Sequence, residues 1–205
     1  MSGGHGRIAN VGAAVLIGGA STRMGADKAQ LPFAGAPAAT RASRLLASLF
    51  GDVALVGAAP PGDAIGRSVD DGTGERCALR GVAAALAAAS TDRVLVVATD
   101  LVLLTPELVL GLVAWPEADV VLPRIDGLIE PLCALWRRAP VLERARTQLA
   151  AERFALHALV AQLDARFVEG DDLRALDPDG TALANANTPE EWSRLEAIAL
   201  GGGGR

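Results

Sequence analysis

Short apolar runs without polar interruption constrain the fold of this chain more than any other feature. The run RVLVVA at residues 93–98 and the run VGAAVLI at residues 11–17 do not alternate between apolar and polar positions. Such strands are buried on both faces, which is typical of parallel sheets covered by helices. Because these runs alternate with helical stretches, we predict an α/β fold. It is a single doubly wound, mostly parallel sheet with helices on both faces.

The element boundaries follow from the apolar runs and from capping signals. Strands are expected at residues 11–17, 53–57, 93–98, 118–122 and 130–136, and a further short strand before Asp70. Helices are expected at residues 38–50, 78–89 and 105–114, and within about 139–162. Thr105 is placed to cap its helix, with Pro106 in the first turn. The domain is expected to span residues 11–198, with residues 1–10 and 200–205 as flexible tails.

The charge and composition exclude some classes of partner. The net charge is −5, so the chain has no general attraction to a polyanion. Aromatic residues make up 3% of the sequence and tyrosine is absent, which argues against a protein that stacks nucleic-acid bases. We therefore expect no nucleic-acid partner, and any anionic ligand must be held by local positive groups.

The lack of a recognisable targeting signal and the cysteine content favour a cytoplasmic location. The first ten residues lack the charged and apolar regions of a signal peptide. The most apolar region, residues 94–115, is interrupted by Asp100, Pro106 and Glu107, which argues against a membrane span. Cys77 and Cys133 have no histidines at metal-site spacing, so reduced structural thiols are expected.

The loop after the first strand, GGASTRMGADK at residues 18–28, has the composition of a phosphate-binding segment. Glycines let backbone N–H groups approach an anion, and Arg23 and Lys28 supply positive charge. Its spacing matches neither a P-loop nor the dinucleotide fingerprint. Lys28 is the only lysine among 19 basic residues, and a compact ammonium fits between phosphate oxygens where a planar guanidinium does not. We therefore predict that Lys28 contacts phosphates; the alternative is a turn with solvated charges.

Residues 16–37, LIGGASTRMGADKAQLPFAGAP, resemble the signature L-A-G-G-x-S-x-R-M-G-x-D-K-x-x-L-x-x-x-G-x-P of molybdenum cofactor guanylyltransferases. These enzymes belong to a wider nucleotidyltransferase group with a Rossmann-like fold. The resemblance implies that the backbone of Leu16, Ile17 and Gly18 meets the nucleotide and that Lys28 binds its phosphates. The Gly-Gly pair favours the guanine-specific branch, whereas Ile17 replaces the usual alanine, and a larger side chain near the base would alter the pocket.

Two aspartates at predicted strand ends are candidate site residues. Asp100 follows the strand at residues 93–98, and a carboxylate there can hold Mg²⁺ against triphosphate oxygens. The resemblance implies that Asp71 contacts the nucleotide. A capping or turn aspartate is the alternative at each position. The family motif D-x-P lacks its proline here, because Val102 occupies that position, and the asparagine that the family often carries is replaced by Gly57.

Two further family motifs occur, the first in altered form and the second complete. The family loop G-P-L-x-G reads CALRG at residues 77–81. The segment NANTPEE resembles the family's N-x-N-T-P-E-E, in which Thr188, Pro189 and Glu191 form a capping box. The cap does not explain Asn185 and Asn187, so we expect them near the active site, orienting the acceptor or the metal.

The resemblance implies an enzyme that transfers GMP from GTP to the terminal phosphate of molybdenum-bearing molybdopterin, releasing pyrophosphate. Asp100 would hold Mg²⁺, the cofactor, and Lys28 and Arg23 would stabilise the phosphoryl charge. Transient contacts with molybdenum-insertion or molybdoenzyme-maturation proteins are expected. Three alternatives remain open: CMP transfer to the same cofactor, nucleotidyl transfer to another phosphorylated acceptor, and a nucleotide-binding protein without catalysis.

Overall fold

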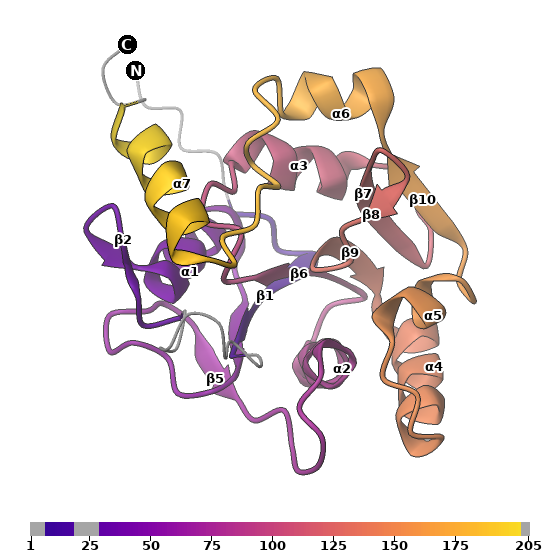
Figure 1. Ribbon diagram of the computed structural model, residues 1–205. Helices are drawn as coiled ribbons and strands as arrows, with labels where there is room; N and C mark the ends of the chain where they lie inside the picture. The colour runs from indigo at the N-terminus through magenta and orange to yellow at the C-terminus, as the bar shows by residue number, and fades with distance from the viewer. Residues whose placement is uncertain (1–6, 19–28, 202–205) are drawn as a thin grey trace.

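The computed structural model describes residues 7–18 and 29–201 (Figure 1). The strands are β1 (Val11–Ile17), β2 (Pro32–Phe33), β3 (Ala36–Pro37), β4 (Val53–Gly57), β5 (Arg67–Val69), β6 (Arg93–Ala98), β7 (Val120–Ile125), β8 (Leu128–Ile129), β9 (Cys133–Arg137) and β10 (Ala165–Val168). The helices are α1 (Ala38–Leu49), α2 (Ala78–Ala88), α3 (Pro106–Ala114), α4 (Arg138–Ala150), α5 (Leu156–Val160), α6 (Gly170–Leu176) and α7 (Pro189–Gly201).

The main sheet has the strand order β10-β7-β9-β6-β1-β4-β5, with β8 paired to β7. Most neighbouring strands run parallel, as the apolar runs predict, and β9 runs antiparallel to both β6 and β7. No helix lies between β7 and β9, so the chain turns back directly through β8 and cannot place β9 parallel to β7. The predicted mostly parallel α/β fold is therefore confirmed, with β9 and the short β8 as antiparallel strands.

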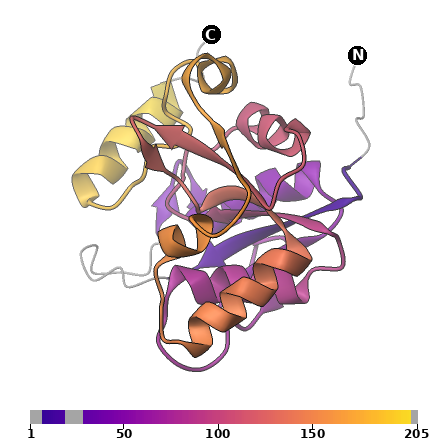
Figure 2. The same cartoon turned by 90° about the vertical axis from the view of Figure 1, so that its right-hand side faces the viewer.

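Alternate residues of each central strand pack into different layers. On β1, Val15 and Ile17 contribute to the cluster that faces α1 and α3, whereas Ala14 and Leu16 contribute to the cluster that faces α2, α4 and α5. Figure 2 shows these two groups of helices on opposite sides of the sheet. Among the residues that the structure describes, no helix is both long and apolar enough to cross a bilayer.

Several predicted boundaries differ from the structure. The helical stretch expected within residues 139–162 divides into α4 and α5, because Glu152 adopts a positive φ of 52°. The side chain of Gln148 donates to the carbonyl of Ala155 (2.8 Å) and stabilises that break. The strand expected at residues 118–122 is β7, which begins at Val120 and continues to Ile125, and that expected at 130–136 is β9, which begins at Cys133.

A third, smaller cluster joins α7 to the β2–β3 hairpin and to the loop after β6. Phe33 packs edge-on against Trp192, with ring centroids 5.4 Å apart, and Val102 and Ala186 are buried with them. The indole nitrogen of Trp192 donates to the carbonyl of Pro32 (3.0 Å). This cluster brings the segment before α7 against the end of β6, although more than 80 residues separate them in the sequence.

We expect Gly57→Ala to destabilise the fold by about 3 kcal/mol and Gly35→Ala by about 1 kcal/mol. Both glycines have positive φ, +106° and +88°. A Cβ at Gly57 would lie 2.4 Å from the carbonyl oxygen of Ile17, whereas nothing lies within 4 Å of one at Gly35. That carbonyl also accepts from the amide of Ala58 (2.9 Å), so moving it breaks a further bond. Chemical denaturation of both variants measures the difference; equal losses would contradict the steric argument.

Candidate functional site

The carboxyl ends of four neighbouring strands form the edge that carries the candidate site. In the register of the sheet Ile17 pairs with Gly57, Leu16 pairs with Ala98, and Val56 pairs with Val69. The segments that follow these strands therefore emerge side by side in the order β5, β4, β1, β6. Doubly wound folds bind ligands at such edges. Arg23 and Lys28, both predicted to contact phosphates, lie outside the described residues.

The end of β1 places backbone, rather than side chains, at this edge. Leu16 and Ile17 are buried in opposite layers, at 7% and 3% exposure. Gly18 is exposed with φ +104°, and a Cβ there would lie 3.4 Å from the side chain of Ala58. Of the three residues predicted to contact the nucleotide through their backbone, only Gly18 is thus exposed. The Ile17 side chain packs into the core, so in the structure the difference from alanine affects packing.

The two aspartates after β5 have different surroundings. Asp70 accepts a hydrogen bond from the amide of Gly72 (2.7 Å), which is the Asx turn expected for this residue type. The carboxylate of Asp71 instead faces the end of β4, with Oδ2 3.8 Å from where a Cβ of Gly57 would lie. Glycine at position 57 therefore keeps a side chain out of the crowded position between the carbonyl of Ile17 and the carboxylate of Asp71. The structure brings Asp71 to the site edge, as the sequence predicts.

The altered motif at residues 77–81, which forms the cap and first turn of α2, keeps the packing on which the edge depends. Cys77 occupies the position directly before α2, and a Cβ at Gly81 would lie 3.2 Å from Leu16 Cδ1, so helix and strand meet closely there. Arg80, which stands inside this motif, donates through Nε to the carbonyl of Glu75 (3.0 Å). Its guanidinium Nη2 lies 2.8 Å from where a Cβ of Gly74 would lie. Arg80 thus fixes the loop between β5 and α2.

Asp100 is half-buried directly after β6, next to the buried Thr99. Its carbonyl accepts from the amide of Ala186 (3.2 Å), which ties the loop to the segment before α7. Val102, which replaces the family proline, is buried in the cluster with Phe33. The described residues contain no group of three carboxylate, thiol or imidazole ligands, so Asp100 is not part of an all-protein metal cage within that part of the chain.

The asparagine segment reaches the same edge by tertiary contacts. Asn185 donates through Nδ2 to Oε2 of Glu130 (3.2 Å), at the start of the β8–β9 connection. The exposed Asn187 donates its backbone amide to Glu191 Oε2 (2.8 Å). Glu191 also accepts from the amide of Thr188 and donates its own amide to Thr188 Oγ1, so the predicted capping box is confirmed. Glu130 could not be identified from the sequence, because a partner 55 residues away leaves no local pattern.

An ion pair holds the far end of this edge. Arg124, near the end of β7, donates through Nη2 to Oε1 of Glu169 (2.6 Å), and its guanidinium stacks 4.2 Å from the ring centroid of Phe167. The hydrogen bond lowers the pKa of Glu169 and raises that of Arg124. Beyond it, Leu128 at the tip of the β7–β8 hairpin is 77% exposed.

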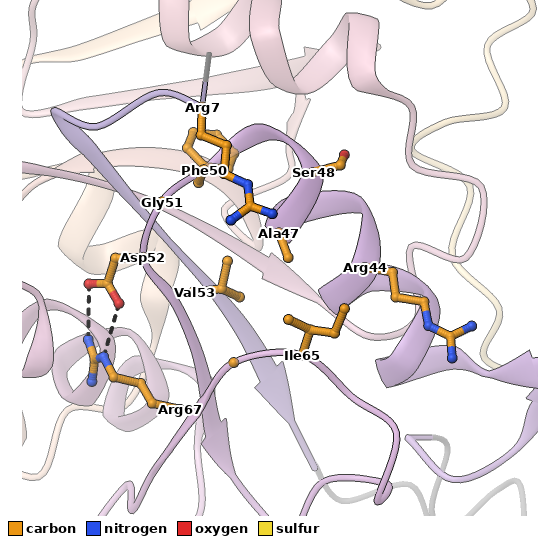
Figure 3. A pocket seen from close by; sticks show the side chains of 11 residues that line it. Arg7, Arg44, Ala47, Ser48, Phe50, Gly51, Asp52, Val53, Ile65 and Arg67 are labelled. Atoms are coloured by element: carbon orange, nitrogen blue, oxygen red, sulfur yellow. Dashed lines mark hydrogen bonds and ion pairs between the residues drawn. The ribbon is translucent and has the colours of Figure 1, made fainter. Parts of the chain in front are cut away.

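A hollow of about 470 Å³ lies at the opposite edge of the sheet (Figure 3). Val53 lines it, and because this is the first residue of β4, the hollow is separated from Gly57 by the length of that strand. Two of its arginines already have carboxylate partners: Arg67 bonds Asp52 (3.1 Å) and Arg44 bonds Asp63 (3.0 Å). This hollow is therefore separate from the candidate site, and the charges of these two arginines are offset.

Comparison with known proteins places the chain among nucleotidyltransferases. A model of the MobA-like NTP transferase domain matches residues 13–167. A probable molybdenum cofactor guanylyltransferase from Chloroflexus aggregans is 32% identical over 194 residues, covering 89% of this chain and 92% of that protein. Molybdopterin-guanine dinucleotide biosynthesis protein A from Archaeoglobus fulgidus has a similar structure, with a TM-score of 0.77, 19% identity, and coverage of 92% of this chain and 98% of that one.

The fold extends to enzymes named for other nucleotides. A 2-C-methyl-D-erythritol 4-phosphate cytidylyltransferase from Thermus thermophilus matches with a TM-score of 0.67 and 18% identity, covering 91% of this chain and 98% of that one. Because structures this distant share only the fold, the Rossmann-like nucleotidyltransferase architecture by itself does not select the base.

The two cysteines differ in burial. Cys133 at the start of β9 is fully buried, and Cys77 before α2 is half-buried. Burial raises the pKa of the Cys133 thiol, and the negative charges of Glu130 and Asp177 raise it further. A thiol that holds its proton in this way is not a nucleophile, which agrees with the structural role expected for it.

We expect Cys133 to resist alkylation by iodoacetamide at a pH of about 8 in the folded protein, while Cys77 reacts. The raised pKa keeps Cys133 a thiol, and its burial excludes the reagent. Mass spectrometry after timed quenching measures the two rates, and Cys77→Ala isolates Cys133. In the unfolded protein Cys133 should react freely. Rapid labelling of Cys133 before unfolding would contradict the buried position.

Proposed function

Because the chain belongs to the family of MobA-like NTP transferases, we propose that it transfers GMP from GTP to the terminal phosphate of molybdenum-bearing molybdopterin. The observation that carries this proposal is the row of Gly18, Gly57, Asp71 and Asp100 along one sheet edge, in a chain whose relatives are named as guanylyltransferases. We further propose that the protein is cytoplasmic. We also propose that it makes transient contacts with proteins for molybdenum insertion or for the maturation of molybdoenzymes.

The reaction is an exchange of one phosphoric anhydride linkage for another. An oxygen of the acceptor's terminal phosphate attacks the α-phosphorus of GTP, the bond between the α-phosphorus and the bridging oxygen breaks, and pyrophosphate leaves with that oxygen. Charge gathers on phosphoryl oxygens in the transition state. Positioning and electrostatic stabilisation therefore supply the catalysis, and no covalent nucleophile from the protein is required.

We assign the following roles to residues in the described part of the edge. The exposed backbone at Gly18, next to the buried Leu16 and Ile17, borders the nucleotide, and Asp71 contacts it from the end of β5. Strands lie about 4.8 Å apart, so the axes of β5 and β6 are separated by about 14 Å. Asp71 and Asp100 therefore act on different parts of the substrate.

The phosphate end of the site combines Asp100 with the loop after β1. A half-buried carboxylate at a strand end suits Mg²⁺, which prefers one or two carboxylates together with phosphate and water oxygens. Bound there, Mg²⁺ would neutralise the charge of the triphosphate. Lys28 and Arg23, beyond the described residues, would add positive charge to the same phosphates. Asn185 and Asn187 belong to the acceptor side, next to the loop that carries Asp100.

We expect Asp100→Asn to lower kcat/KM at least about a hundredfold, or about 2.7 kcal/mol of transition-state stabilisation. The substitution removes the negative charge that suits Mg²⁺ and preserves the size of the side chain. Asp92→Asn is the matched control, because this exposed aspartate precedes the same strand at its other end. Pyrophosphate release in the presence of GTP, Mg²⁺ and molybdopterin measures both. Full activity of a folded Asp100→Asn variant would overturn the assignment.

We expect GTP with Mg²⁺ to raise the melting temperature more than CTP does at equal concentration. A ligand at about a hundred times its Kd stabilises the native state by about 2.7 kcal/mol, so the difference is measurable. Equal protection by CTP would transfer the proposal to cytidylyl transfer. Protection by GTP without pyrophosphate release would indicate a binding protein, and release with a different phosphorylated acceptor would change the substrate.

A further inference from the structure

Glu130 uses both carboxylate oxygens to join segments that are far apart in the sequence. Oε1 accepts from the backbone amide of Leu132 (3.1 Å), and Oε2 accepts from Nδ2 of Asn185 (3.2 Å). Its own amide donates to the carbonyl of Pro123 (3.0 Å), which anchors the residue beside β7. Glu130 is therefore held by its backbone amide and by one carboxylate oxygen, independently of its hydrogen bond to Asn185.

This contact determines which way the amide of Asn185 faces. An ionised carboxylate only accepts hydrogen bonds, so Asn185 must turn its NH₂ group toward Glu130. The amide group is planar, and its carbonyl oxygen consequently points away from Glu130. Because the neighbouring Ala186 donates its amide to the carbonyl of Asp100 (3.2 Å), Asn185 is held beside the loop that carries the proposed metal ligand.

We propose that Glu130 is a positioning residue for nucleotidyl transfer: it orients Asn185 so that the amide oxygen, and not the NH₂ group, faces the reacting groups. The inference rests on the proposed function. A carbonyl oxygen in that orientation accepts hydrogen bonds from water or from substrate hydroxyl groups. Unlike the NH₂ group, it does not donate a hydrogen bond to the oxygen atoms that surround a cation. Glu130 touches neither substrate in this role and acts only through Asn185.

The substitution Glu130→Gln tests the orientation without removing bonds. The introduced amide has one acceptor oxygen, and the backbone amide of Leu132, which cannot turn over, retains it. The introduced NH₂ group then faces Asn185, whose amide must rotate by about 180° to accept from it. Both hydrogen bonds survive, so stability is kept, but the NH₂ group of Asn185 now faces the reacting groups.

The substitution Asn185→Asp supplies the complementary change. Alone, it places a second carboxylate against Glu130 in place of a hydrogen-bond donor, and the lost bond and the repulsion displace the segment. Combined with Glu130→Gln, the introduced carboxylate accepts from the introduced amide and keeps an oxygen on the side of the reacting groups. The pair of substitutions thus restores both the bond and the orientation with the hydrogen-bond direction reversed.

The experiment measures kcat, KM for GTP and melting temperature for the wild type, both single variants and the double variant, using GTP, Mg²⁺ and molybdopterin. Glu143→Gln, an exposed change on α4, is the control with unchanged activity. We expect kcat to fall about tenfold in each single variant and to recover to within about threefold of the wild type in the double variant. The melting temperature of Glu130→Gln should stay that of the wild type.

Two outcomes would overturn the proposal. Full kcat in Glu130→Gln at wild-type stability would show that orientation is irrelevant, and a double variant as impaired as the product of its single variants would show that the two residues act independently. Failure of the proposed function is distinguishable, because the wild type would then release no pyrophosphate from GTP with this acceptor, while the melting temperatures would still report the hydrogen-bond exchange.

Discussion

The parallel pairing of β1 with both β4 and β6 is the interaction on which the rest of the structure depends. All seven residues of β1 are buried, so the strand is held on both edges by backbone hydrogen bonds and on both faces by helices. Once its register is fixed, the carboxyl ends of three strands align. The positions of Gly57 and Asp100 beside Gly18 are then determined by backbone geometry rather than by contacts between their side chains.

Features encoded by neighbouring residues could be predicted from the sequence. The buried strand at residues 93–98, the cap at Thr105 and the capping box of Thr188 and Glu191 each depend on local apolar runs or on side chains three residues apart. The antiparallel direction of β9 could not be predicted in this way. An apolar run looks alike in either direction, and direction is determined only by how the chain returns.

The residues of the candidate site show the same difference between features encoded locally and features that depend on long-range contacts. Gly18 and Asp100 could be identified because apolar runs precede them, and Asp71 because the family resemblance points to it. Glu130 could not, since its role depends on a side-chain hydrogen bond across 55 positions and on the packing of α7. Likewise, the sequence shows that Ile17 replaces alanine, but only the structure shows that its side chain lies in the core.

The two halves of the edge therefore differ in what maintains them. The half proposed to bind the nucleotide is built into the central sheet and persists as long as that sheet is folded. The half proposed to bind the acceptor is held by the small cluster around Phe33 and Trp192 and by the amide of Ala186 bonded to Asp100. Regions with few buried contacts open at lower free energy than the core. In the proposed function, nucleotide binding is consequently tied to the central sheet, whereas the proposed acceptor side can change in sequence, or open, without disturbing β1.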